Sequence, residues 1–148
     1  MKKFTIYTDG GARGNPGPAA GGVVFCNEKG EKVKEYGKYL GDSLTNNEAE
    51  YGAAVFALEK FKATFGKALA KSAEIDIFSD SQLLVKQING EYKIENEKLI
   101  PLFIRLWNLR LDFKKVRIKY IPRTKNTEAD RMVNETLDEE AGKNSLFE

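Results

Sequence analysis

The stretch IYTDGGARGNPGPA, from Ile6 to Ala19, gives the strongest indication of the fold. It begins as an apolar run of β type, ends that run on Asp9, and continues through glycines and prolines that are typical of turns. An aspartate at such a place often does no more than open a turn. The glycines after it also let a ligand approach the backbone closely, which makes Asp9 a candidate site residue.

Strands and helices are predicted to alternate after this first strand. Alternating or β-rich patterns predict a strand at 3–8, a hairpin at 21–41, and strands at 73–80 and 116–123. Helical periods and end signals predict helices at 43–66, 81–90, 95–113 and 126–142. This order predicts an α/β fold with a mixed sheet of about five strands, the first three antiparallel, flanked by helices.

Two of the predicted helices carry specific signals near their starts. Thr45 and Glu48 form a capping-box pattern, although Asn46 or Asn47 also suits the cap position. Pro101 either occupies the first turn of its helix or kinks that helix.

The composition indicates one domain, 1–148, with a core of about residues 4–137 and an acidic tail at 138–148. Hydrophobic residues make up 41% of the chain, and no run approaches the ~18–20 apolar residues of a membrane span. The single cysteine, Cys26, excludes an internal disulfide and suits a reducing compartment. We therefore expect a soluble cytoplasmic monomer that does not contact a membrane.

The charged residues limit the chemistry and indicate a binding face. The chain has 24 lysines and arginines, 22 acidic residues and no histidine. Without histidine, hydrolytic chemistry must depend on carboxylates. Basic residues concentrate between Arg105 and Lys125, which predicts a local basic face, and Trp107 within this stretch is predicted to belong to the core.

Two aspartates lie at the carboxyl ends of predicted strands. Asp9 ends the first strand, and Asp80 ends the strand at 73–80. These ends form the site crevice of parallel α/β arrangements, so adjacent parallel strands would bring the two side chains together. The alternative for Asp80 is a helix N-cap, a role that aspartate and serine both fill well.

Two more carboxylates lie on apolar faces of predicted helices. Glu50 begins an apolar stripe and is therefore aimed at the sheet, unless it reaches solvent from the helix end. The stripe continues through Ala54, Ala57, Leu58, Phe61 and Phe65. Asp130 borders the apolar face that contains Val133 and Leu137, although it also suits the acidic first turn of a helix.

Four carboxylates directed at one sheet, in a chain without histidine, predict a site for a hard cation. Oxygen ligands suit Mg²⁺ or Mn²⁺. Two such ions can activate a water and stabilise the leaving oxygen in phosphodiester cleavage. Without metal, repulsion between the carboxylates is expected to raise at least one pKa.

The chain contains four motifs in order: YTDGGARGNPGP, TNNEAEYGA, FSDSQ and PRTKNTEAD. Together they closely resemble ribonuclease HI, the type 1 ribonucleases H, over about residues 4–137. The resemblance implies the five-stranded mixed sheet already predicted. It implies endonucleolytic cleavage of the RNA strand of RNA–DNA hybrids, leaving 3′-hydroxyl and 5′-phosphate ends. It also implies two Mg²⁺ or Mn²⁺ ions, with ligands at Asp9, Glu50, Asp80 and Asp130.

The resemblance further implies a set of substrate-binding residues. The loop after the first strand matches the segment that lies in the hybrid's minor groove, where 2′-hydroxyls distinguish RNA from DNA. The matching residues of this loop are Gly10, Gly11, Arg13, Gly14 and Asn15. Residues that match contacts with the DNA strand or the minor groove are Thr45, Asn46, Asn47 and Gln82. Asn126 matches a polar residue near the last aspartate, and helix capping is its alternative.

The chain departs from many relatives in two respects. The loop before Asp130 is short and has no histidine, so a metal-activated water is expected to carry out the hydrolysis. Arg123 and Lys125 are close in the sequence, but neither is a good general base at neutral pH. The segment after Gly90 leads directly into the next helix, so a basic protrusion that grips the DNA strand is expected to be absent.

Three rival functions are compatible with parts of the sequence. A non-catalytic nucleic-acid-binding module conflicts with the complete set of four acids. A resolvase or integrase core on the same fold fits the TNNEAE and GNPGP motifs poorly. A nuclease that also cleaves double-stranded RNA is fully compatible with the sequence.

Overall fold

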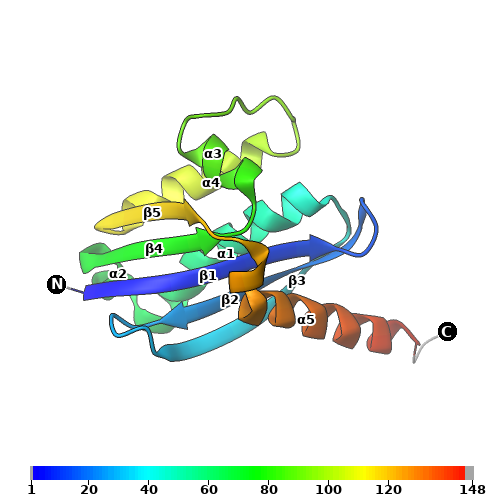
Figure 1. Ribbon diagram of the computed structural model, residues 1–148, viewed down its shortest axis with the longest axis horizontal. Helices are drawn as coiled ribbons and strands as arrows, with labels where there is room; N and C mark the ends of the chain where they lie inside the picture. The colour runs from blue at the N-terminus through cyan, green and yellow to red at the C-terminus, as the bar shows by residue number, and fades with distance from the viewer. Residues whose placement is uncertain (1, 146–148) are drawn as a thin grey trace.

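The computed structural model describes residues 2–145 as a five-stranded mixed sheet flanked by helices (Figure 1). The strand order is β3-β2-β1-β4-β5, in which the first three strands of the chain are antiparallel and the last two run parallel to β1. The strands are β1 Lys2–Ala12, β2 Gly17–Cys26, β3 Lys32–Leu44, β4 Ala73–Ser79 and β5 Lys115–Tyr120. The predicted fold class is confirmed, including the hairpin between β2 and β3.

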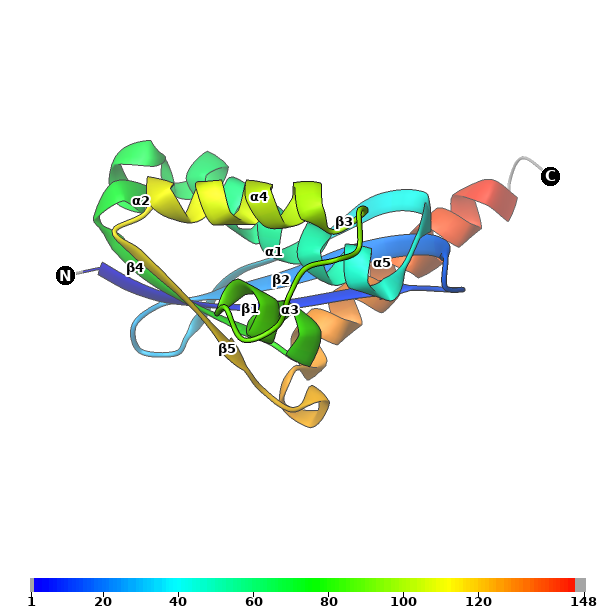
Figure 2. The ribbon, with the colours of Figure 1, turned by 90° about the horizontal axis from the view of Figure 1, so that it is seen from above.

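Helices cover both faces of the sheet (Figure 2). The helices are α1 Asn46–Phe65, α2 Lys67–Ser72, α3 Gln82–Ile88, α4 Ile100–Leu109 and α5 Thr127–Ser145. α1 packs on β1 and β2 and carries α4 on its outer side, whereas α5 packs on β2 and β3 from the opposite face. No helix within residues 2–145 is both long enough and apolar enough to cross a membrane.

Two consecutive glycines in β2 allow a helix to approach the sheet closely on each face. Successive strand positions point to opposite faces of a sheet. A Cβ on Gly21 would lie 3.0 Å from Ala53 of α1, and a Cβ on Gly22 would lie 2.2 Å from the carbonyl oxygen of Ala129 in α5. Because Gly22 pairs with Asp9, both helices approach the sheet closely beside a predicted site residue.

The register between β1 and β4 brings two predicted site residues to one edge of the sheet. Thr8 pairs with Ser79 across the parallel ladder. Asp9 and Asp80 each follow one of these paired residues, so they lie side by side, although β1 does not end at Asp9 as predicted but continues to Ala12 in its pairing with β2. The expectation that adjacent parallel strands bring these aspartates together is therefore confirmed.

Three helices differ in extent from the prediction. α2 is not predicted from the sequence at all. α4 begins at Ile100 rather than at 95, because Pro101 occupies the first turn, where a missing N–H is tolerated. α5 continues through Ser145, so most of the predicted acidic tail is helical, and residues 146–148 lie outside the described residues.

Trp107 does not belong to the core, contrary to the prediction. Its side chain is 41% exposed, stacks on Phe103 and lies under the guanidinium of Arg110, 3.5 Å from the ring centroid. Leu106 is buried in its place. Adjacent helical residues point about 100° apart, so only one of these two neighbours can face α1 and the sheet.

Candidate active site

Three carboxylates from three elements meet at the carboxyl edge of β1 and β4. Asp9 of β1, Glu50 of α1 and Asp80 after β4 each contribute an oxygen, and these oxygens all lie within 4.8 Å of one another. Asp9 and Glu50 are only 5% and 8% exposed. Burying several carboxylates together is unfavourable in itself, which marks this edge as a candidate functional site.

Hydrogen bonds from two strands hold the Glu50 carboxylate. The Gly10 N–H donates to Oε1 at 3.1 Å, and the Ser79 hydroxyl donates to Oε2 at 3.5 Å. The reciprocal capping box of Thr45 and Glu48 fixes the start of α1 and so sets the direction of Glu50. The alternative in which Glu50 reaches solvent is therefore wrong.

Ser79 is a site residue that was not predicted from the sequence. It is fully buried at the end of β4, and its hydroxyl also accepts a hydrogen bond from the Ser81 N–H at 3.1 Å. The available signal was a polar residue at an inward position of the alternating strand, directly before Asp80.

Asp80 does not cap the helix that follows it. The N-cap of α3 is Ser81, whose hydroxyl accepts from the Leu84 N–H at 3.2 Å. The capping alternative for Asp80 is therefore wrong, and its carboxylate instead faces the other two acids.

Asn126 connects the start of α5 to the two central strands. It is 1% exposed and donates its amide to the Thr8 carbonyl at 2.8 Å and to Asp80 Oδ2 at 3.4 Å. Asn126 also stands at the cap position of α5, where its carbonyl accepts from the Asp130 N–H at 3.1 Å, but its side-chain Oδ1 accepts no hydrogen bond from any residue that the structure describes. In this buried position Asn126 orients Asp80 rather than facing outward to a ligand.

Asp130 lies beside the group of three acids rather than inside it. It belongs to the first turn of α5 and lines a cavity of about 300 Å³ together with Asp9, Glu50 and Arg123. The amide of Asn134, one turn later, donates to Asp130 Oδ2 at 3.3 Å. The four predicted carboxylates thus gather at one edge, and three of them form the tight group.

The crowded carboxylates are difficult to ionise together. Burial, followed by the negative charge of Asp80, raises the pKa of Asp9 to about 7, and Asp130 contributes in the same direction. Burial, followed by the charges of Asp9 and Asp80, raises the pKa of Glu50 well above its ordinary value. The predicted rise in pKa is confirmed, and a bound cation would relieve its cause.

Known proteins share both this sequence pattern and this fold. Residues 7–136 match the family model described as reverse transcriptase-like. Ribonuclease HI of Halobacterium salinarum is 40% identical over 133 residues, which are 90% of this chain and 63% of the relative. The chain belongs to the ribonuclease H family. It spans only 36% of another relative, the bifunctional protein Rv2228c of Mycobacterium tuberculosis, at 34% identity.

Solved ribonuclease H structures match the whole described fold. LC11-RNase H1, solved in complex with an RNA/DNA hybrid, gives a TM-score of 0.87 at 40% identity, covering 93% of this chain and 99% of that one. The N-terminal RNase H domain of Rv2228c gives a TM-score of 0.84 at 32% identity, covering 97% and 99%. The five-stranded arrangement is therefore that of the ribonuclease H family.

The segment that follows Asp9 in this ribonuclease H chain has a packed part, which still belongs to β1, and an open part. Gly10 is buried against α1, and a Cβ added to Gly11 would lie 3.4 Å from the Val133 side chain of α5. The residues exposed at the tip are Arg13, Gly14, Asn15 and Pro16. Gly14 has a φ of 100°, which favours glycine. Only the tip is open to a large ligand.

Two asparagines connect this loop to the start of α1. The Asn46 N–H donates to Asn15 Oδ1 at 3.0 Å, and the Ala12 N–H donates to Asn46 Oδ1 at 3.0 Å. Thr45 is the N-cap, so the capping alternative for Asn46 and Asn47 is wrong. Asn47 is exposed in the first turn of α1.

Gln82, the remaining predicted contact, lies at the start of α3. Its side chain is exposed and lines a separate cavity with Val85, Lys86, Glu91 and Tyr120. It is therefore not one of the residues that the structure gathers around the carboxylates.

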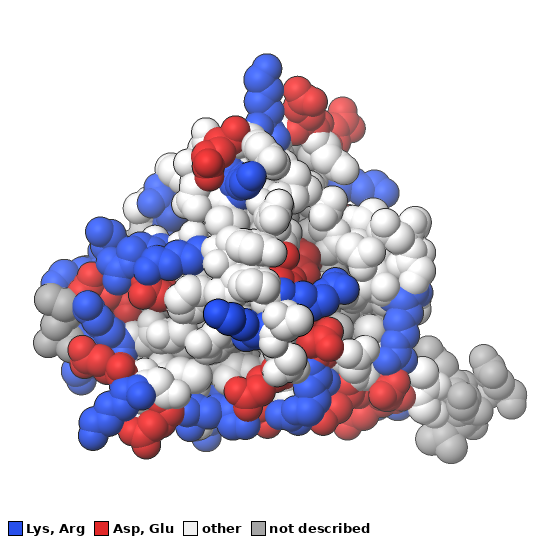
Figure 3. All heavy atoms as spheres, viewed as in Figure 1, with Lys and Arg blue, Asp and Glu red and all other residues white. Residues whose placement is uncertain are grey.

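Two arginines of the predicted basic face between Arg105 and Lys125 are paired with acidic side chains. Arg105 pairs with Glu59 at 2.5 Å, and Arg117 pairs with two acids of β4. Basic and acidic side chains are interspersed around the face shown in Figure 3. Arg123 instead lies in the cavity with the carboxylates.

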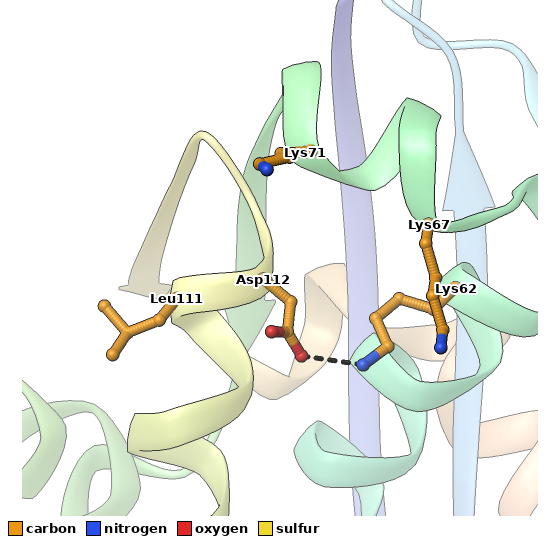
Figure 4. Close-up of a pocket in the computed structure, with 5 residues that line it drawn as sticks. All are labelled: Lys62, Lys67, Lys71, Leu111 and Asp112. Atoms are coloured by element: carbon orange, nitrogen blue, oxygen red, sulfur yellow. Dashed lines mark hydrogen bonds and ion pairs between the residues drawn. The ribbon is translucent and has the colours of Figure 1, made fainter.

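Another cavity, of about 290 Å³, lies at the opposite end of the sheet, beside α2 (Figure 4). Its lining residues are Lys62, Lys67, Lys71, Leu111 and Asp112. Lys62 is paired with Asp112 at 2.6 Å. The cavity is remote from the carboxylate group and shares no lining residue with the cavity there.

We expect Gly10→Ala to destabilise the protein and disable the site together. The added methyl group would lie 2.2 Å from backbone atoms of Ala49, and relief of this clash must move the N–H that holds Glu50. Overpacking of this kind costs roughly 1–3 kcal/mol, so thermal unfolding should shift down by roughly 3–10 °C. Gly142→Ala is the control, because nothing lies within 4 Å of its added Cβ. Equal melting temperatures for the two variants would contradict this expectation.

Proposed function

We propose that this protein is a metal-dependent endonuclease that hydrolyses the RNA strand of RNA–DNA hybrids, leaving 3′-hydroxyl and 5′-phosphate ends. The proposal rests on the buried group of Asp9, Glu50 and Asp80, with Asp130 lining the cavity beside it. Relatives named ribonuclease H, and the RNase H1 solved with an RNA/DNA hybrid, support the choice of substrate.

The residues of this site fit Mg²⁺ or Mn²⁺. The donors of the tight group are carboxylate oxygens, which these cations prefer, and the pKa values of Asp9 and Glu50 are raised first by burial and then by the negative charge of the neighbouring acids. We propose that two ions bind with substrate, held by these two residues together with Asp80 and Asp130. The ions would supply an activated water and charge stabilisation of the leaving oxygen.

The protein's own side chains prepare this site in three ways. The Gly10 N–H and the Ser79 hydroxyl fix Glu50, and the Asn126 amide fixes Asp80. Arg123 lines the cavity and adds positive charge where a phosphate would enter. Because a guanidinium stays protonated at neutral pH, Arg123 contributes charge rather than acting as a general base.

The substrate contacts are proposed for the residues around this cavity. The loop tip of Arg13, Gly14 and Asn15, with Gly11 at its base, would follow the minor groove beside the RNA 2′-hydroxyls. The start of α1, which contains Thr45, Asn46 and Asn47, would face the DNA strand. Gln82 would contact the hybrid farther from the carboxylates.

Asn15→Ala should weaken hybrid binding more than it slows the chemical step. The side chain connects the loop to the Asn46 N–H and does not touch the carboxylates. Losing one such hydrogen bond is worth about 1 kcal/mol, so KM should rise about fivefold with a smaller change in kcat. Steady-state kinetics measures both values. Asn27→Ala is the matched control, because Asn27 accepts its bonds within the distant β2–β3 turn. A fall in kcat larger than the rise in KM would contradict the proposed role.

One cleavage assay tests the proposed activity. Labelled RNA–DNA hybrid, double-stranded RNA, single-stranded RNA and DNA are each incubated with Mg²⁺, Mn²⁺ or EDTA. We expect cleavage of the hybrid with metal and none in EDTA. Failure to cleave the hybrid with either metal would refute the proposal, and binding without cleavage would favour a non-catalytic module. Cleavage of double-stranded RNA would extend the substrate range.

We further propose a cytoplasmic monomer, which size-exclusion chromatography and cell fractionation can test.

A further inference from the structure

A strip of polar contacts along α5 connects Asp130 to the loop after β1. Asp130, Asn134 and Asp138 succeed one another at intervals of one helical turn and share one face of α5. The Asn134 amide donates to the Asp130 carbonyl at 3.1 Å and to its carboxylate Oδ2 at 3.3 Å. Arg13 donates to the Asn134 carbonyl at 3.4 Å and pairs with Asp138 at 2.7 Å.

We propose that Asn134 is a positioning residue that aims the Asp130 carboxylate at the metal site. The proposal rests on the proposed role of Asp130 as a metal ligand. Asp130 is half-buried and lies outside the tight group, so packing alone constrains its rotamer less than it constrains Asp9 or Glu50. An amide that donates to Oδ2 holds the carboxylate in one orientation and leaves the other oxygen free for a cation.

Asp80 is also held by an asparagine amide. There the Asn126 amide donates to Oδ2 at 3.4 Å, as the Asn134 amide does to Asp130. Two aspartates that are less buried than Asp9 are thus each held by an asparagine, one directly before α5 and one within it. Asn134 also lines the cavity that contains Asp9 and Glu50, which places it beside the reacting groups.

The contact with Arg13 gives the strip a second effect. The ion pair between Arg13 and Asp138 is exposed, with side chains 44% and 70% accessible, so it adds little to stability. The ion pair instead affects the geometry, because it connects the loop tip to the helix that carries Asp130. The loop tip and the fourth carboxylate are therefore both connected to the same helix, α5.

The test compares Asn134→Ala, Asn134→Gln and a control, Glu135→Gln, in a hybrid-cleavage assay titrated with Mn²⁺. Glu135 is the next residue along α5 and only pairs with Arg131 on the surface. We expect Asn134→Ala to lower kcat about fivefold and to raise the Mn²⁺ concentration for half-maximal activity about fivefold, with KM unchanged. Asn134→Gln keeps an amide donor in reach of Asp130 and should recover most of the loss.

Calorimetric titration of Mn²⁺ without nucleic acid supplies a readout independent of activity. Asn134→Ala should bind Mn²⁺ about two- to fivefold more weakly, while its melting temperature stays within about 2 °C of the wild type. Adding Asn134→Ala to Asp130→Asn should cause no further loss, because Asn134 acts through Asp130.

The failures of the two proposals are distinguishable. If Asp130→Asn is inactive but Asn134→Ala keeps the wild-type Mn²⁺ requirement, the positioning role is refuted and the proposed function stands. If Asp130→Asn is fully active, the assignment of Asp130 as a ligand fails first. A rise in KM alone for Asn134→Ala would also overturn the positioning role and would indicate direct contact with the hybrid.

Discussion

Asp9→Asn should reduce hybrid cleavage by at least about 10³-fold while the protein still folds and binds the hybrid. Asparagine keeps the shape of the side chain but cannot supply the negative charge that a divalent cation needs. Asp9 is the residue on which the site converges, since it neighbours Glu50, Asp80 and Asp130. Loss of metal-based stabilisation worth several kcal/mol corresponds to this loss of rate.

Single-turnover cleavage with Mg²⁺ measures this effect, and fluorescence anisotropy in EDTA measures hybrid binding separately. Asp112→Asn is the matched control, because Asp112 only pairs with Lys62 at the far end of the sheet. It should leave the rate unchanged. An Asp9→Asn variant that cleaves within tenfold of the wild type would show that the buried carboxylates are not the catalytic centre.

The same substitution should make the metal-free protein more stable at neutral and alkaline pH. The folded state raises the pKa of Asp9 from 3.8 to about 7, so it holds this proton more tightly than the unfolded state does. Between these two values the stability of the wild type therefore falls as pH rises. Asparagine carries no proton to lose, so at pH 8 the variant should exceed the wild type by roughly 2–4 kcal/mol.

Urea denaturation in EDTA at a series of pH values from 4 to 8 tests whether the stability of the wild type falls as the pH rises. The wild type should lose stability along the series, Asp112→Asn should follow it, and Asp9→Asn should vary less. Glu50 remains in all three and gives a residual slope of the same sign. Mg²⁺ or Mn²⁺ should then stabilise the wild type more than Asp9→Asn, because a ligand stabilises the state that binds it. Parallel curves for Asp9→Asn and the wild type would contradict the raised pKa.

The positions of the main acids could be predicted because each follows from a periodic pattern. Glu50 heads an apolar stripe whose direction is fixed by the helical period, and Asp9 and Asp80 directly follow the last paired residues of two strands that the chain order makes parallel. Ser79 and Asn134 escaped prediction because their roles depend on which hydrogen bond a short polar side chain makes. No period of the sequence encodes that choice.

Two sequence features each allow more than one structural outcome. Gly10 matches a ligand-facing motif and packs against α1, because a missing side chain permits close approach of either a ligand or a helix. Trp107 was expected inside, yet α4 carries large apolar residues on both faces, with Leu106 inward and Ile104 and Trp107 outward. Hydrophobicity alone cannot then decide which face is buried.

The two consecutive glycines of β2 set the distance between the helices that carry Glu50 and Asp130. At Gly21 and Gly22 the sheet is no thicker than its backbone, with Glu50's helix against one side and Asp130's helix against the other. A methyl group at the first position would displace only α1, and one at the second only α5. Protein engineers could therefore widen the spacing of the carboxylates from either side of the sheet, without replacing any residue proposed to touch metal or nucleic acid.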